Sequence, residues 1–304
     1  MKKTIISALT LLALVSCAKE QTPSPVDPGT MPIVFGSPAV LATKSVTEST
    51  ASTIQTDGFN VACVKSNNSV YFNSKAVWES ANSYYNPAAT GKVYYYPNSG
   101  TVSFYACYPV SESISVTSGA ATIAYTQAGS KDLVVAKKTG VSAQSSSVAL
   151  TFDHALAKCI VTAKGDDSKV TYKLKSVSLN APATGTYAFA TNSWTPGSAS
   201  AVSYYNDASG MDISTSAATT VATPLTFVPG KLVLTASWEC YIDTELVGSY
   251  TASTAAVTEA NAVNLQQGKE NTINLTLKNA DAKTISFTVS LNAWGTASQD
   301  ITLQ

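Results

Sequence analysis

The chain has 304 residues and no net charge, and its charged residues fill only 12% of positions, with lysine as the only strongly basic type. This length allows two domains, and a composition rich in β-branched and aromatic residues is typical of all-β extracellular proteins. Basic residues do not outnumber acidic ones, and the sequence contains no arginine. Both facts argue against a nucleic-acid partner and against binding to an anionic membrane surface.

Residues 1–17 have the organisation of an export signal. Two lysines precede an apolar run that is too short to cross a bilayer as a helix. The run ends in Leu-Val-Ser-Cys, which resembles the lipobox of bacterial lipoproteins, where the cysteine, here Cys17, becomes the lipid-modified first residue. The alternative is an ordinary signal peptide cut near the same place. Residues 18–32 are rich in proline and polar side chains, which predicts a tether between lipid and folded domain.

Residues 33–146 are predicted to form a first β-sandwich domain. The run 33–41 is predicted to be an edge strand or an interrupted strand, because Pro38 cannot donate to a ladder. A polar loop over 43–57 follows, and a short helical turn is expected only around 75–81. Turns rich in Asn, Ser and Gly separate the other predicted strands, which are 59–64, 70–72, 93–96, 102–108, 114–116, 121–125 and 133–136.

A small, polar stretch at 140–147 is predicted to link this domain to a second β-sandwich domain over 147–304. The second domain is expected to open with one strand over 148–164, because its apolar residues take alternate positions. Further strands are predicted at 171–179, 186–189, 201–205, 225–227, 232–242, 245–250, 271–277 and 284–291.

His154, the only histidine, is the first candidate for chemistry. No second histidine completes a zinc site, and Asp153 points to the opposite face of a strand, so the two do not form an acid–base pair. We therefore predict a structural histidine whose ring nitrogens bond nearby backbone. The adjacent carboxylates Asp166 and Asp167 fit a turn better than a glycosidase site. No catalytic residue, metal or cofactor is predicted.

Four cysteines remain in the mature chain, and they allow three disulfide pairings. An oxidising compartment permits bridges, but each cysteine lies inside an apolar strand pattern, so buried free thiols are an equal alternative. Disulfide bridges and free thiols both stay open as alternatives for Cys63, Cys107, Cys159 and Cys240.

Several sequence motifs occur in a recognisable order. They are DGFNVACV, VYYYPNSGTVSFYACYP, DLVVAKK, TFDHALAK, LQQGKENTINLTL and a terminal LNAWG. Together they resemble the fimbrillin family, the bacterial type V pilins and their cell-surface relatives, over nearly the whole mature chain. The resemblance implies an all-β protein of two tandem transthyretin-like, Greek-key β-sandwich domains without enzymatic activity, displayed at the outer membrane or in a fimbrium.

The resemblance also implies a mode of assembly. In this family, proteolysis in the following loop removes the first strand, and the opened groove accepts a carboxy-terminal strand from a neighbouring subunit. The loop cut maps to Lys44; shaft pilins are cut after arginine, so either a lysine-directed protease acts here or the strand stays in place. The displaced strand maps to Ile33, Val34, Phe35, Val40 and Leu41.

The donor strand would be residues 299–304, in which Ile301 and Leu303 share one face. The alternative is a last strand that stays in its own sheet. We therefore expect a structural subunit or adhesin of a type V fimbria, with other fimbrial subunits, outer-membrane lipid and host or bacterial surface ligands as partners. The alternatives are a solitary surface lipoprotein that binds glycan or host protein through exposed aromatic residues, and a surface glycosidase, for which no nucleophile–base arrangement emerges.

Overall fold

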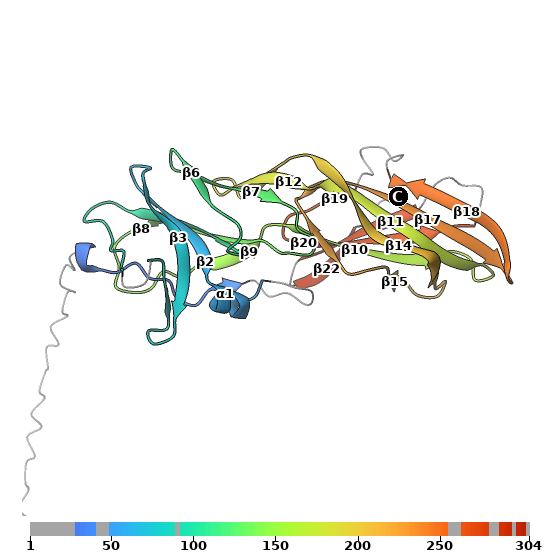
Figure 1. Ribbon diagram of the computed structural model, residues 1–304, viewed down its shortest axis with the longest axis horizontal. Helices are drawn as coiled ribbons and strands as arrows, with labels where there is room; N and C mark the ends of the chain where they lie inside the picture. Colours follow the sequence, from blue (N-terminus) through green and yellow to red (C-terminus); the bar gives the residue numbers. More distant parts are fainter. Residues whose placement is uncertain are drawn as a thin grey trace, which may run out of the picture.

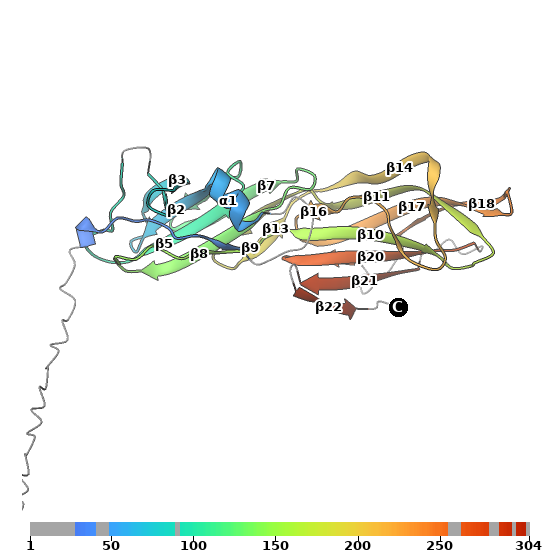
Figure 2. The same ribbon diagram turned by 90° about the horizontal axis from the view of Figure 1, so that it is seen from below.

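The computed structural model describes residues 28–40, 49–88, 92–254, 263–279, 286–293 and 296–301. The molecule is elongated, with the strands of the first half of the chain at one end and most of those of the second half at the other (Figure 1, Figure 2). Its strands form four sheets, so the predicted all-β class is confirmed. The helices that the structure describes with both ends are η1 (Pro28–Thr30) and α1 (Ala51–Asp57).

A seven-stranded sheet forms the first half of the molecule. Its strands lie in the order β1-β9-β8-β5-β2-β3-β4, and only β1 and β9 pair in parallel. Both faces of this sheet are buried, since Val61 and Cys63 of β2 enter one apolar cluster and Ala62 enters another. Its strands are β1 (Ala39–Val40), β2 (Phe59–Lys65), β3 (Val70–Glu79), β4 (Tyr84–Asn86), β5 (Val102–Tyr108), β8 (Val134–Val141) and β9 (Thr151–His154).

A four-stranded sheet covers one face of the seven-stranded sheet. Its strands are β6 (Ser115–Thr117), β7 (Ala120–Thr126), β12 (Thr184–Ala188) and β13 (Ser193–Pro196), in the order β13-β12-β7-β6. Ile123 and Tyr187 from this sheet pack with Cys107 and Val135 of the seven-stranded sheet. Because β12 pairs with β7, a hairpin from later in the chain completes the layer over the first half.

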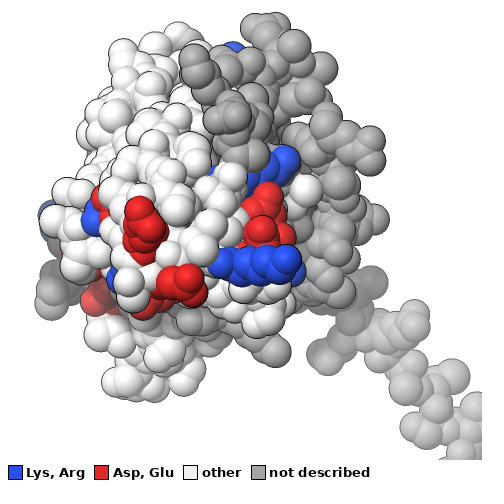
Figure 3. All heavy atoms as spheres, turned by 90° about the vertical axis from the view of Figure 1, so that its right-hand side faces the viewer, with Lys and Arg blue, Asp and Glu red and all other residues white. Residues whose placement is uncertain are grey.

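Two further sheets form the second half of the molecule, and they enclose an apolar core that includes Leu234, Trp238 and Ile273. One has six strands: β10 (Ala157–Gly165), β15 (Thr219–Thr220), β16 (Leu225–Phe227), β20 (Lys269–Leu277), β21 (Ser286–Ala293) and β22 (Thr296–Ile301). The other has five: β11 (Thr171–Pro182), β14 (Ala199–Ile213), β17 (Gly230–Ile242), β18 (Glu245–Ser253) and β19 (Val263–Leu265). The end of this half carries lysines and carboxylates side by side (Figure 3).

The prediction of one strand over 148–164 is wrong, because this stretch forms two strands in different sheets. β9 pairs with β8 and β1, whereas β10 pairs with β20, β16 and β15. Between them, the neighbours Ala155 and Leu156 are both fully buried in the cluster that joins the two halves. The chain therefore changes sheet after His154, whereas the whole of the predicted linker at 140–147 precedes β9, and its first two residues belong to β8. Alternation of apolar residues continues across this bend and did not reveal it.

Three other local expectations also differ from the structure. The residues expected to form a helical turn at 75–81 belong largely to β3. Residues 93–96 form only an isolated bridge, between Tyr95 and Pro32. The predicted loop 43–57 ends in α1, where the Thr50 and Thr53 side chains each accept a bond from the other's backbone amide. These short reciprocal bonds stabilise a helix too brief to show apolar periodicity.

No helix in the described ranges is long and apolar enough to span a membrane. Across the same ranges, no group of three or more His, Cys, Asp or Glu side chains is placed to hold a metal ion. All four described cysteines are buried free thiols, which decides the alternative that the sequence left open.

Candidate functional site

Residues 31–40, which we call the first segment, bond to β9 and the stretch before it at one end of the seven-stranded sheet and to β4 at the other, and their buried apolar side chains enter the cluster that includes Val61 and Cys63. Ile33 and Phe35 are fully buried there, whereas Val34 and Val40 are half-buried. Only Ala39 and Val40 form a regular strand, β1. The segment is thus held in an extended but interrupted conformation.

One edge of the first segment bonds to β4 and to the loop before β5. The Phe35 and Tyr85 backbones exchange two hydrogen bonds, of 3.0 and 2.8 Å. The Ile33 amide donates to the Tyr94 carbonyl at 2.7 Å, and the Tyr96 amide donates to the Met31 carbonyl at 2.9 Å. These bonds pair backbone amides and carbonyls of the first segment with those of its neighbours. Without them, these buried polar groups would have no hydrogen-bond partner.

The other edge bonds to the stretch that leads into β9. The Gly36 amide donates to the Val148 carbonyl at 3.0 Å, and the Val148 amide donates to the Val34 carbonyl at 2.8 Å. Further along, the Ala39 amide donates to the Leu150 carbonyl at 3.2 Å, next to the parallel pairing of β1 with β9. The first segment therefore sits as a middle strand between two parts of the chain that are distant in sequence.

The side chain of Phe35 is the centre of an aromatic cluster. Its ring packs edge-on against Phe59 and Phe104, at centroid distances of 5.6 and 5.2 Å. Phe59 in turn contacts Tyr85 at 5.1 Å and Phe152 at 5.4 Å. Each such ring pair contributes about 0.5–1.5 kcal/mol beyond the burial of its area. Withdrawal of the segment would expose this cluster.

Two buried tyrosines, Tyr85 and Tyr96, belong to the same apolar cluster as Phe35. Among the described residues, none gives the hydroxyls of Tyr85 and Tyr96 a hydrogen-bond partner. Burial raises the pKa of both phenols to about 12, so they stay protonated at neutral pH. Each therefore offers a donor inside an otherwise apolar groove.

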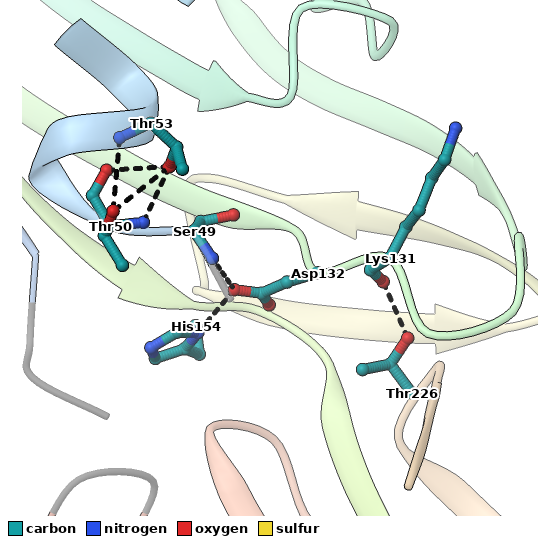
Figure 4. A network of polar contacts seen from close by, with 7 residues as sticks. All are labelled: Ser49, Thr50, Thr53, Lys131, Asp132, His154 and Thr226. Carbon is teal, nitrogen blue, oxygen red and sulfur yellow. Dashed lines mark hydrogen bonds and ion pairs between the residues drawn. The ribbon is translucent and has the colours of Figure 1, made fainter. Parts of the chain in front are cut away.

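A buried polar network holds the chain where it enters α1 (Figure 4). The Asp132 Oδ2 atom accepts a bond from the Ser49 amide at 3.3 Å and lies 2.8 Å from His154 Nδ1. The Asp132 and His154 side chains are only 2% exposed, so no substrate reaches them. Nearby, the Thr226 hydroxyl donates to the Lys131 carbonyl at 2.6 Å and ties this loop to the second half.

The His154 partner differs from the expectation, which was nearby backbone. Its Nδ1 atom contacts a carboxylate 22 residues away in sequence. Asp153, the residue before His154 in β9, lies on the opposite face of the strand, as strand geometry requires. The sequence signal that could have suggested the pair was an aspartate, Asp132, directly before the apolar run of β8.

The remaining predicted site residues fall at the ends of the described ranges. β22 is an edge strand that pairs antiparallel with β21, with Ile301 opposite Val289 (Figure 2). Cys17, Leu41, Lys44 and Leu303 lie outside the described residues.

Residues 40–294 match a family model described as fimbrillin-like. The chain belongs to the fimbrillin-like family. The resemblance seen in the sequence motifs is thereby confirmed. None of the curated proteins matches this fimbrillin-like chain in sequence.

Two solved structures are similar to the chain. A fimbrial protein from Bacteroides vulgatus ATCC 8482 is 18% identical, with a TM-score of 0.59, over 86% of this chain and 99% of that one. A putative cell adhesion protein from Bacteroides uniformis ATCC 8492 is 17% identical, with a TM-score of 0.49, over 87% and 96% of the two chains. The first of these similarities shows that the arrangement of sheets is that of a fimbrial protein.

Proposed function

We propose that this chain is a structural subunit or adhesin of a fimbria, and that it assembles by exchanging its first segment for a strand of a neighbouring subunit. Membership of the fimbrillin-like family supports the fimbrial role. The observation that carries the proposed exchange is the way Phe35 is held. Its side chain is fully buried and its backbone bonds to Tyr85, while its neighbours Val34 and Gly36 bond to Val148.

Loss of the first segment would leave a groove that requires another strand. Unpaired amides and carbonyls would line both edges of the groove, and the rings of Phe59 and Phe104 would be exposed to water. An extended chain with apolar side chains at alternate positions can replace both sets of contacts. Ile33 and Phe35 are two residues apart, and so are Ile301 and Leu303. The proposed donor thus repeats the spacing of the residues it would replace.

The proposed cut at Lys44 would separate two anchored points. On one side, Val40 pairs in register with Phe152. On the other, the Ser49 amide is bound by Asp132, and Thr50 caps α1. A cut between them would release the first segment while α1 and the sheet keep their own anchors.

The test is digestion of the mature protein with a lysine-specific protease, followed by mass spectrometry and size-exclusion chromatography. We expect one early cut at Lys44 and then a ladder of oligomers. The Lys44→Gln variant should stay whole and monomeric, and a variant that lacks residues 299–304 should be cut without forming oligomers. A cut protein that stays monomeric would reject strand exchange and favour the solitary surface lipoprotein.

We also propose that Cys17 carries the lipid that anchors the subunit in the outer membrane. The predicted tether then ends at residue 30, because Met31 and Pro32 already bond to Tyr96 and Tyr95 in the first domain. The Leu-Val-Ser-Cys sequence at the end of the apolar run supports the anchor. Labelled palmitate should be incorporated by the wild-type chain and not by Cys17→Ser. Equal labelling of the two chains would reject the anchor.

A further inference from the structure

Two buried side chains of the first segment each lie beside a buried tyrosine. Next to an antiparallel bridge, the Tyr96 amide bonds to the Met31 carbonyl, so these two residues lie opposite each other. Phe35 and Tyr85 form a second antiparallel bridge. Opposite residues of an antiparallel pair point to the same face, with β-carbons about 4.5–5.5 Å apart. Met31 is therefore a side-chain neighbour of Tyr96, and Phe35 of Tyr85, within one apolar cluster.

The hydroxyls of these tyrosines are unsatisfied in the groove. Tyr85 is fully buried and Tyr96 is 2% exposed, and no described residue accepts a hydrogen bond from either hydroxyl. Buried hydroxyls are usually paired, because an unpaired one loses its bonds to water without replacement. The first segment cannot supply the acceptor, since Met31 offers only a thioether, which accepts weakly, and Phe35 offers only a ring. The segment thus fills the groove in shape and leaves two donors unpaired.

The proposed donor strand matches the burial pattern of the first segment. The side chains of residues 31–35 are in turn buried, exposed, buried, half-buried and buried. Residues 299–303 read Gln-Asp-Ile-Thr-Leu. Laid over residues 31–35 in the same direction, they put Ile301 and Leu303 at buried places, and the aspartate and the threonine at the exposed and half-buried places. Each of these side chains suits the surroundings that it would enter.

Gln299 is the exception, because it falls at the buried place of Met31. An amide there would be unfavourable in an apolar groove without a partner. The Tyr96 hydroxyl lies beside this place and lacks an acceptor, which the side-chain carbonyl of glutamine can supply. A donor in this direction also repeats the bonding of the first segment, which runs antiparallel to the loop before β5 and parallel to the stretch before β9. The glutamine and the unpaired hydroxyl therefore complement each other.

We infer that Gln299 of a neighbouring copy determines the recognition of the donor strand, and that its side-chain carbonyl accepts the Tyr96 hydroxyl in the place of Met31. The exchanged state then pairs a donor that the uncut subunit leaves unpaired, which gives the exchange a direction. The Tyr85 hydroxyl stays unpaired in both states, because Leu303 beside it offers no acceptor. This inference rests on the proposed strand exchange and identifies how the partner strand is recognised.

The first test is Tyr96→Phe, for which the uncut subunit and the oligomer should respond in opposite directions. In the uncut mature protein, the variant loses only an unpaired hydroxyl, so its melting temperature should rise by about 2 °C. After digestion with a lysine-specific protease, its isolated oligomers should dissociate in guanidinium chloride about tenfold faster than wild-type oligomers, since the bond to Gln299 is missing. A lower melting temperature of the uncut variant would show that the hydroxyl is already paired, which would overturn the inference.

The second test changes the donor side. Gln299→Met introduces the residue type that the first segment has at this place and removes the amide, so its oligomers should also dissociate about tenfold faster. The double variant Tyr96→Phe with Gln299→Met should be no weaker than either single variant, because both changes remove the same bond. The matched controls are Tyr85→Phe and Gln304→Met, which should leave the dissociation rate of the oligomers unchanged.

Melting curves of the uncut variants establish that they fold, and Gln299→Leu replaces Gln299→Met if that variant does not. Oligomers of Tyr96→Phe that dissociate at the wild-type rate would overturn the inference, and so would additive losses in the double variant. Faster dissociation in Tyr85→Phe instead of Tyr96→Phe would overturn the assigned direction of the donor. These failures would leave the wild-type ladder of oligomers in place, whereas a wild-type chain that is cut and stays monomeric would reject strand exchange itself. A wrong recognition residue and a wrong assembly mode are therefore distinguishable.

Discussion

The two halves of the molecule close their apolar cores in different ways. In the second half, a six-stranded and a five-stranded sheet face each other, and the central strands β11 and β17 have 12 and 13 residues. In the first half, the cluster on one face of the seven-stranded sheet is completed by the first segment, which bonds to both ends of that sheet with only two residues of regular strand, and by the single buried side chain Ile54 of α1.

This difference bears on the proposed exchange of the first segment. Long strands such as β17 share their bonds and side chains with several neighbours, so none of them leaves without breaking the sandwich. The first segment concentrates its burial in Ile33 and Phe35, and its backbone bonds run to separate parts of the chain. Its loss would uncover one face of one sheet and leave the order of the strands β9 to β4 intact.

The largest expected effect is that of Phe35→Ala. Removal of a fully buried phenylalanine costs about 3–5 kcal/mol of unfolding free energy. We expect this loss to appear first as opening of the first segment, with fast hydrogen exchange at the Ile33 and Phe35 amides. Phe227→Ala is the matched control in the second core, with a similar cost.

Denaturant titration gives the unfolding free energy, and hydrogen exchange locates the opening. Phe227→Ala should leave exchange of the first segment slow. If both variants open the two halves together, the cores form one cooperative unit and the contrast between them fails.

The next effect concerns the buried network. Asp132→Ala leaves the Ser49 amide and His154 Nδ1 without their acceptor, which costs about 1–3 kcal/mol. The control is Asp212→Ala in the second half, where the partner Lys173 is 3.1 Å away and Asp212 is 75% exposed. An exposed pair of this kind contributes about 0.2–1 kcal/mol. Equal losses in thermal unfolding would show that burial of the network is unimportant.

A smaller effect is expected at the start of α1. Thr50→Ala removes the side chain that accepts from the Thr53 amide at 3.1 Å, which costs about 1 kcal/mol. Thr56→Ala is the control, since this exposed threonine only bonds back to the Ser52 carbonyl and alanine favours the helix. Circular dichroism melts that rank the two variants the other way would contradict the capping role.

Much of the strand inventory could be predicted, because short strands with turn residues between them leave a period-two pattern. β2, β5 and β16 match their predicted ranges within one residue. The path of the chain between sheets could not be predicted. Ala155 and Leu156 continue an apolar stretch, and only their shared burial between the two halves shows the bend.

The candidate site was foreseen in part. The apolar residues of the first segment were visible as a strand, and the family resemblance indicated its removal. Its two-sided bonding to Tyr85 and Val148 was not visible, because those partners lie far along the chain. The contact between the β12–β13 turn and β8, where the Lys137 ammonium donates to the Phe189 carbonyl, was missed for a related reason, because no local pattern in the sequence encodes it.

The last prediction concerns the thiols, of which each half has two. Burial raises the pKa of Cys63 and Cys159 to about 12, above the ordinary thiol value of about 8.5. The unfolded chain therefore loses these protons at lower pH than the folded chain. Stability is fully present below about pH 8.5 and falls as pH rises toward 12, by about 1.4 kcal/mol per pH unit for each thiol.

At pH 8, iodoacetamide should leave every described thiol of the native protein unmodified, and a reducing agent should not change the melting temperature. After removal of the first segment, the two halves should differ. Cys63 lies in the cluster that the segment covers, whereas Cys107 faces the four-stranded sheet and Cys159 lies in the second core. Selective alkylation of Cys63 would therefore show that the groove has opened while both other cores stay closed. Simultaneous reaction of Cys63 and Cys159 would show global unfolding instead.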